Sequence, residues 1–361
     1  MLPALSDTKP SLADVFPSCL AAIRGEENRL RLPAVRAAIV LLVDGLGSAA
    51  LAARAGHART LHAASSTIQS GFPTTTASAL ATLTTGTAPG QHGLVGYSVL
   101  DAAHDRVINQ LSGWDGIDPL TWQPQPTIFE QAVDAGHTAT VIAPGRYRDS
   151  PFTHAVLRGA TFVAAESIAE RLEVATTLSG LVYVYVPELD KLGHQHGVES
   201  SQWTVALEGL DGLVAAMRLP ADAGMLVTAD HGMIDVAPHN HILYDTVPEL
   251  MAGVAHVGGE PRCLQLYVEP GADLDALVAA WHASEDARSW VATRAEAIEA
   301  GWFGTVRPEV ESRIGDLLVA ARKGIAYYSS TASERSRAMV GQHGSWSAAE
   351  LNVPLIRLGA F

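Results

Sequence analysis

The sequence contains little positive charge and almost no cysteine. Its 361 residues include 24 Lys and Arg against 38 Asp and Glu, which gives a formal net charge of −14. A protein that binds long nucleic acids needs a basic face for the phosphates, so this balance excludes a general nucleic-acid binder. Cys19 and Cys263 are the only cysteines. Two cysteines in a chain of this length do not form a disulfide scaffold, and they predict a reducing compartment.

Long apolar runs are also absent. The longest, Ala37 to Val43 and Leu181 to Val186, fall far short of the roughly 20 residues that a bilayer requires. The first residues do not combine a basic stretch with an apolar one, as a secretory signal does. We therefore expect a cytoplasmic protein without a membrane partner. With 48% hydrophobic and 17% charged residues, the chain is also not of the disordered class.

Short apolar runs rich in Val, Ile and Leu recur along the chain. They lack polar alternation, which is typical of strands buried on both faces. The predicted strands are residues 37–45, 138–145, 181–187, 225–232 and 352–358. Stretches with helical spacing lie between them, at residues 48–55, 128–135, 167–175 and 203–217. This alternation predicts an α/β fold, an α/β/α sandwich around a mostly parallel central sheet.

Changes in composition suggest three parts of the chain. Residues 1–34 carry four prolines and are expected to form an N-terminal arm. Residues 35–235 and 331–361 hold the predicted core strands. The segment 236–330 is richer in Pro and Gly and is expected to be a smaller subdomain, or cap, inserted before the last core strand.

Acidic and imidazole side chains follow three of the predicted strands, and one more precedes the last strand. These residues are Asp44, Asp190, His194, Asp230, His231 and His343. Taken singly, an Asp at a strand end is most often a cap or turn residue. Ligands of doubly wound sheets, however, bind beyond the carboxyl ends of the strands, where these residues would gather. Three carboxylates and three imidazoles suit two zinc-type ions, with Mn or Fe as alternatives.

A run of three threonines, Thr74 to Thr76, precedes a helix-forming stretch in GFPTTTASALATLTTG. A threonine at this place can be a helix cap, which explains one of the three. Alternatively, one of them is a nucleophile, which needs a base or a metal to lose its proton. The first turn of a helix also offers free N–H groups to phosphate oxygens.

Five motifs in this order resemble the alkaline phosphatase superfamily, and more closely its type I phosphodiesterase/nucleotide pyrophosphatase branch. They are VDGLG, FPTTTASALATLTTGTAPGQHGLVGY, ELDKLGHQHG, TADHGM and GQHGSW. The resemblance spans about Ala37 to Phe361. It implies an alkaline phosphatase-like core and a two-metal hydrolase of phosphodiester or pyrophosphate bonds that works through a phosphothreonine intermediate.

The resemblance also implies a role for each residue. Asp44, Asp230 and His231 would hold one ion together with the nucleophile. Asp190, His194 and His343 would hold the other. The nucleophile of the family lies three residues after the proline of its motif, which makes it Thr76.

Two positions depart from the family pattern. Nucleotide pyrophosphatases typically follow the nucleophile with Phe-Pro-Asn, whereas this chain has Ala77-Ser78-Ala79. The Ala77 side chain cannot stack on a base, so only its backbone N–H could assist the phosphate. Tyr185 matches a position that often forms the other face of a base clamp, although packing in the core explains it equally well.

Several alternatives stay open at this point. The expected substrate is a small phosphodiester or nucleotide-like molecule. A phosphomonoesterase or phosphonate hydrolase would use the same metals, and an inactive metal-binding relative would keep them without turnover. The sequence gives no oligomeric state.

Overall fold

The computed structural model describes residues 2–6 and 8–361. Its centre is a seven-stranded sheet with the order β2–β17–β8–β1–β7–β5–β6. The five strands from β8 to β6 are parallel, and β17 runs antiparallel to both of its neighbours. The strands are β1 Ala37–Val43, β2 Ser65–Gln69, β5 Ala139–Ala143, β6 Thr161–Ala164, β7 Gly180–Val186, β8 Ala223–Thr228 and β17 Asn352–Gly359.

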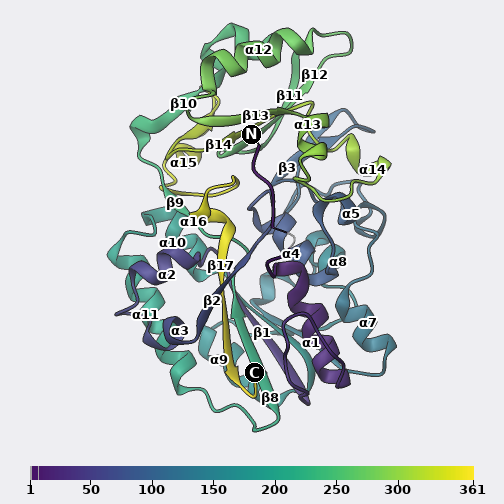
Figure 1. Cartoon of the computed structure of the whole chain (residues 1–361), viewed down its shortest axis with the longest axis vertical. Coiled ribbons are helices and arrows are strands. Elements are labelled where there is room, and N and C mark those ends of the chain that lie inside the picture. The colour runs from purple at the N-terminus through teal and green to yellow at the C-terminus, as the bar shows by residue number, and fades with distance from the viewer. Residues whose placement is uncertain (1, 7) are drawn as a thin grey trace.

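Helices cover both faces of this sheet (Figure 1). One face carries α1 Val15–Arg24, α4 Thr76–Thr85 and α7 Ile128–Asp134. The other carries α2 Ser48–Ala53, α3 Arg59–Ala63, α9 Ile168–Thr177, α10 Glu188–His196 and α11 Ser201–Ala216. The predicted α/β/α sandwich with a mostly parallel sheet is therefore confirmed. None of the helices within the described residues has the length and apolarity that a membrane crossing requires.

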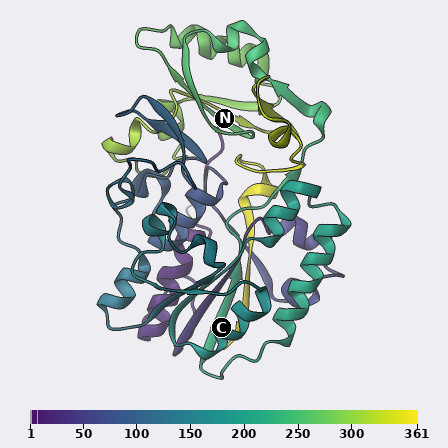
Figure 2. The same cartoon turned by 180° about the vertical axis from the view of Figure 1, so that it is seen from behind.

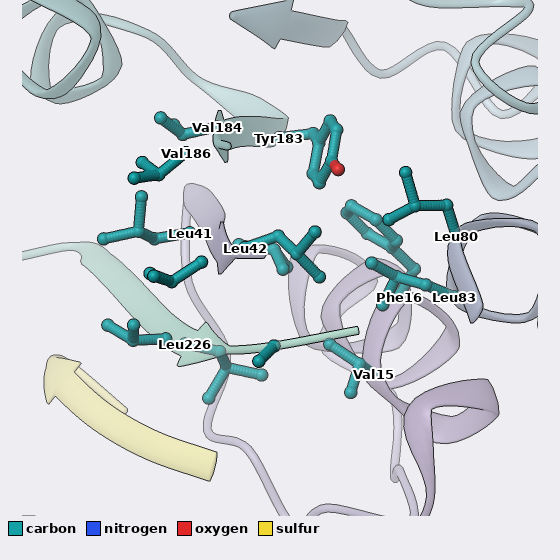
Figure 3. Packing of buried hydrophobic residues seen from close by; sticks show 14 of the residues in the cluster. Val15, Phe16, Leu41, Leu42, Leu80, Leu83, Tyr183, Val184, Val186 and Leu226 are labelled. Carbon is teal, nitrogen blue, oxygen red and sulfur yellow. The ribbon is translucent and has the colours of Figure 1, made fainter. Parts of the chain in front are cut away.

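The middle strands are buried on both faces because they carry apolar side chains at every position. All seven residues of β1 are buried, and so are those of β8. Figure 3 shows Leu41 and Leu42 of β1 beside the side chains of β7 and β8, with Phe16 and Leu80 packed from the helical layer. Because these strands are packed on both faces, the positions of the carboxyl ends of β8, β1 and β7 are fixed.

The first residues contribute more to the core than an arm would. Leu12, Val15, Phe16 and Cys19 are fully buried, and Phe16 makes edge-to-face contacts with Phe129 and Tyr183. The prolines of this segment made a helix look improbable in the sequence. Pro17, however, lies in the first turn of α1, where proline is tolerated.

A second, antiparallel sheet lies beyond the carboxyl ends of the parallel strands (Figures 1 and 2). Its order is β11–β12–β14–β13, with β11 Val254–Glu260, β12 Cys263–Val268, β13 Ser289–Thr293 and β14 Leu317–Ala321. Helix α12 (Leu274–Glu285) packs against it, and Trp281 of this helix is fully buried. A hairpin of β3 (Ser98–Asp101) and β4 (Arg106–Asn109) contacts β11. The second sheet, α12 and the β3–β4 hairpin, which are far apart in sequence, therefore cover the carboxyl edge of the central sheet.

Candidate active site at the carboxyl edge of the sheet

The predicted ligands come together because their strands are neighbours. Asp44 follows β1, Asp230 follows β8, and the helix α10 that carries Asp190 and His194 follows β7. The registers place Val43 beside Val186 and Leu42 beside Thr228, so the three strands end at one level. His343 reaches the same edge from the loop after β16 (Gly341–Gln342).

Asp44, Asp230 and His231 form one compact group of potential metal ligands, whose atoms lie within 4.8 Å of one another. His231 Nε2 is 3.6 Å from Asp44 Oδ1 and 3.5 Å from Asp230 Oδ2. The other Asp230 oxygen accepts hydrogen bonds from the N–H groups of Gly45 and His231, at 3.1 and 3.0 Å. These bonds orient the carboxylate so that Oδ2 faces His231.

The second predicted set is also assembled. His194 Nε2 lies 3.3 Å from Asp190 Oδ1 and 3.3 Å from His343 Nε2. His231 bridges the two sets, because it also forms a group of potential ligands with Asp190 and His343, and its ring stacks on that of His343 at 3.6 Å. The six predicted ligands therefore form one continuous cluster.

The three histidines present the same atom to this cluster. In each of them Nδ1 donates to a backbone carbonyl, which leaves the Nε2 lone pair toward the site. The pairs are His194 with Gly341 at 2.8 Å, His231 with Gly232 at 3.1 Å and His343 with Thr74 at 2.8 Å. Burial lowers the pKa of His231 to about 4 and that of His343 well below its usual value, so both rings are neutral, as metal ligands must be.

The carboxylates are placed where negative charge is costly. Burial, followed by the charge of Asp230, raises the pKa of Asp44 well above its usual range. Burial raises the pKa of Asp190 and of Asp230 to about 7. Asp44 Oδ1, Asp190 Oδ1 and Asp230 Oδ2 are buried and have no hydrogen-bond partner. Unpaired carboxylate oxygens beside three Nε2 lone pairs form a donor set that suits divalent cations of the zinc type, so these residues fit two such ions.

The three threonines have different surroundings. The Thr74 hydroxyl donates to the Ser345 carbonyl at 2.8 Å, and therefore holds the loop that carries His343. Thr75 is the N-cap residue of α4, and its buried Oγ1 has no partner. Thr76 begins α4, and its Oγ1 lies 3.2 Å from His231 Nε2, inside the cluster. Ala77 follows in the first turn of the helix, where N–H groups have no partner within the helix.

Tyr185 contacts one of the predicted metal ligands. It is half-buried on β7, and its hydroxyl donates a 2.5 Å hydrogen bond to Asp44 Oδ2. Its ring also meets that of Tyr147 edge to face, with the centroids 5.6 Å apart. The residue therefore orients a potential ligand and also lines a cavity next to Thr76.

A cavity of about 220 Å³ adjoins Thr76 and Asp44. Its wall is mainly apolar and aromatic, with Tyr147, Tyr183, Tyr185, Leu80, Leu111 and Phe152 among the lining residues. Sequence reasoning missed Tyr147, Tyr183 and Lys191, which also line it. Only the place of Lys191, next to Asp190, offered a signal in the sequence.

Comparison with known proteins gives three findings. The sequence profile of the family described as type I phosphodiesterase/nucleotide pyrophosphatase matches residues 38–346. No curated protein sequence matches the chain. Several solved structures share its fold at low sequence identity.

Two of these structures illustrate the fold. Murine ectonucleotide pyrophosphatase/phosphodiesterase 5 has a TM-score of 0.68 at 16% identity, covering 88% of this chain and 87% of the murine one. Phosphonoacetate hydrolase from Sinorhizobium meliloti 1021, solved with phosphonoacetate, has a TM-score of 0.69 at 18% identity and covers 91% of both chains. An inactive variant of the murine protein, with a TM-score of 0.66 at 16% identity over 89% and 87% of the two chains, was solved with AMP.

Proposed function

Because the chain belongs to the type I phosphodiesterase/nucleotide pyrophosphatase family of metal-dependent hydrolases, we propose that it cleaves small phosphodiesters or pyrophosphates with Thr76 as nucleophile. One observation carries this proposal: Thr76 Oγ1 lies 3.2 Å from His231 Nε2, within a cluster of six potential ligands. The substrate we propose is a small molecule, in keeping with the structural neighbours, which were solved in complex with AMP and with phosphonoacetate.

We assign Asp44, Asp230, His231 and Thr76 to one ion, and Asp190, His194 and His343 to the other. Two divalent ions, for which we propose Zn²⁺, supply charge neutralisation and a low pKa for bound water. Support for zinc comes from the equal number of imidazoles and carboxylates, since Mg²⁺ and Ca²⁺ prefer oxygen ligands alone.

The residues of the chain carry the chemistry in two steps. Thr76 Oγ1 releases its proton to solvent and attacks phosphorus, and the Oγ1–P bond forms while the bond to the leaving oxygen breaks. The leaving oxygen departs with the bonding electron pair and takes up a proton from solvent. Water then attacks phosphorus and releases a proton to solvent, while the Oγ1–P bond breaks and Thr76 Oγ1 takes up a proton from solvent. The Ala77 N–H, in the first turn of α4, donates to the phosphoryl oxygen that gains charge.

The cavity favours a diester over a monoester. A monoester dianion needs more positive charge than a diester monoanion. Among the described residues that line the cavity, Lys191 carries the only positive charge. Apolar walls next to Thr76 instead suit an organic group esterified to phosphorus.

Phosphonate hydrolysis is the second candidate, and the likeness to phosphonoacetate hydrolase favours it. We infer a cytoplasmic location from the two cysteines, both buried and unpaired. Turnover of matched aryl diester, monoester and phosphonate substrates by zinc-loaded and chelated protein tests the proposed reaction. We expect zinc-dependent turnover, fastest with the diester. Equal rates after chelation would contradict the two-metal proposal, and a faster phosphonate would favour the second candidate.

A further inference from the structure

A buried carboxyl from the second sheet lies at the start of the nucleophile helix. Glu260 is the last residue of β11, and its side chain is buried. Gly344, next to His343, packs directly on it, since a Cβ at that position would overlap the Glu260 side chain. Figure 1 shows β11 in the upper sheet and α4 below it. Glu260 therefore extends from the upper sheet to the loop that carries His343.

The same carboxyl lies beside Thr75, the residue before the proposed nucleophile. Burial raises the pKa of Glu260 well above its usual value, and the Thr75 hydroxyl, a donor to the carboxyl, acts in the opposite direction. Thr75 Oγ1 and both Glu260 oxygens are buried, and none of the three forms a well-directed hydrogen bond with a described residue. The two side chains therefore face each other as polar neighbours.

Thr75 does not cap the helix that it precedes. A threonine at an N-cap position usually accepts a hydrogen bond from the second or third N–H of the helix. Thr75 forms no such bond with α4, and the N–H groups of Ala77 and Ser78, the second and third residues of this helix, donate to no described residue. Four other helices of the chain do show the bond from the third N–H, at 3.1 or 3.2 Å, and their caps are Thr127, Ser167, Ser200 and Thr293.

We propose that Glu260 is a positioning residue that holds the Thr75 hydroxyl away from the start of α4. The Ala77 and Ser78 N–H groups then stay open to the substrate. Under the proposed function, on which this inference rests, the Ala77 N–H stabilises the phosphoryl oxygen that gains charge. A Thr75 side chain turned toward the helix would occupy these donors before the phosphate group arrived. Glu260 therefore acts through Thr75 and not on the reacting atoms.

Glu260→Met tests the inference, because methionine fills a similar space but cannot attract the Thr75 hydroxyl. That hydroxyl is then expected to cap α4 and to lower kcat about 10-fold, which is part of what the loss of one such donor costs an enzyme. The metal-free variant should be no less stable than wild type, since an apolar group replaces a buried carboxyl that lacks a well-directed hydrogen bond. Glu260→Gln keeps an acceptor for the hydroxyl and should retain kcat within about threefold.

A second substitution, at Thr75, makes the test specific. Valine has the shape of threonine but no hydroxyl, so Thr75→Val leaves the N–H groups of α4 open whichever residue occupies position 260. We therefore expect the double variant of Glu260→Met and Thr75→Val to recover kcat to within about threefold of wild type. A double variant as slow as Glu260→Met, or an unchanged kcat in Glu260→Met, would overturn the proposal.

Glu285→Met is the matched control, since Glu285 of α12 is also a buried glutamate of the upper part. Its carboxylate accepts hydrogen bonds from Arg288 at 2.7 and 2.8 Å and from the Tyr327 hydroxyl at 2.6 Å. This variant should lose stability and keep kcat when it is assayed below its Tm, which is the reverse of the result for Glu260→Met. A comparable loss of kcat in Glu285→Met would overturn the specific role of Glu260.

Amide hydrogen exchange separates this inference from the proposed reaction. Exchange of the Ala77 and Ser78 N–H groups, followed by NMR on the metal-free protein, needs no turnover. Slower exchange in Glu260→Met than in wild type, reversed by adding Thr75→Val, supports the role of Glu260 even if no diester is hydrolysed and the proposed function fails. Equal exchange in the three proteins overturns that role, even if diesters are hydrolysed.

Discussion

Buried carboxylates occur in two regions of this molecule, and their surroundings differ. Glu350 of α16 (Ala348–Leu351) is fully buried, and both of its oxygens accept hydrogen bonds from Arg262 at 2.7 Å. Arg262 stands in the turn between β11 and β12, so this pair joins the upper sheet to the core. At the edge of the parallel sheet, Asp44, Asp190 and Asp230 each keep a buried oxygen without a partner. The paired carboxylate serves the architecture, whereas the unpaired oxygens are free to bind a cation.

Glu260 shows why an unpaired carboxylate is not sufficient by itself. It is buried at the end of β11, and neither of its oxygens has a hydrogen-bond partner. Burial raises its pKa well above the usual value, and Glu260 belongs to neither group of potential metal ligands found among the described residues. What distinguishes the sheet edge is the combination of three such acids with three imidazole Nε2 atoms.

Among the residues at the edge of the parallel sheet, Thr76 has the largest expected effect when it is substituted. Thr76→Ala removes the attacking oxygen and lowers kcat at least about 1000-fold, since knocking out a nucleophile removes its whole pathway. The zinc content stays near two per chain, because the six other ligands remain. Steady-state kinetics and metal analysis measure the two quantities. Thr75→Ala is the matched control, and a comparable loss in that variant would move the nucleophile assignment to Thr75.

At the Glu350–Arg262 pair, Glu350→Gln has the largest expected effect. It leaves the Arg262 guanidinium buried without its counter-charge, and should lower the free energy of unfolding by about 3–5 kcal/mol. Glu350 Oε1 also accepts from the Ser345 N–H at 3.0 Å, so the loop of His343 loosens as well. Chemical denaturation measures the change.

Asp190→Asn is the contrasting variant. It removes a carboxylate oxygen that has no hydrogen-bond partner, so the metal-free protein should be no less stable, while its zinc affinity falls. If Glu350→Gln and Asp190→Asn lowered the free energy of unfolding equally, the distinction between the paired and the unpaired carboxylates would be wrong.

The raised pKa of a single carboxyl gives a smaller effect of known sign. The pKa of Asp190 is raised to about 7 in the folded chain, above the value of 3.8 expected for an unfolded one. Between about pH 4 and pH 7 this carboxyl therefore binds more protons in the folded state, and its contribution to stability decreases as the pH rises. The lowered pKa of His231 and of His343 acts in the opposite direction, so the comparison is made with Asp190→Asn, which keeps both histidines. As the pH rises from about 4 to about 7, the Tm of chelated wild type should fall relative to that of chelated Asp190→Asn. A Tm difference that moves in favour of wild type would contradict the prediction.

The sequence predicted the layers of the fold and the cluster of ligands because both depend on local patterns. Apolar runs such as 37–43 are readable as buried strands, and the residue after a parallel strand has a known place. The contact of Tyr185 with Asp44 and the place of Lys191 in the cavity wall were not predicted, because they depend on side-chain directions. The buried helix of residues 15–24 was missed because the prolines of residues 1–34 indicate an arm when only local sequence is considered.

Tyr185→Phe has the smallest expected effect. It tests whether Tyr185 orients Asp44, contacts the substrate, or does both. The variant keeps the ring against Tyr147 but loses the 2.5 Å hydrogen bond to Asp44. Partners that orient a metal ligand typically contribute about 10-fold or more to metal affinity, so zinc binding should weaken by about 10-fold. Competition with a chelator measures it. If the ring also contacts the substrate, Tyr185→Leu raises KM at saturating zinc whereas Tyr185→Phe does not. A KM that is unchanged in both variants would restrict Tyr185 to the orientation of Asp44, and an unchanged zinc affinity in Tyr185→Phe would restrict it to the substrate.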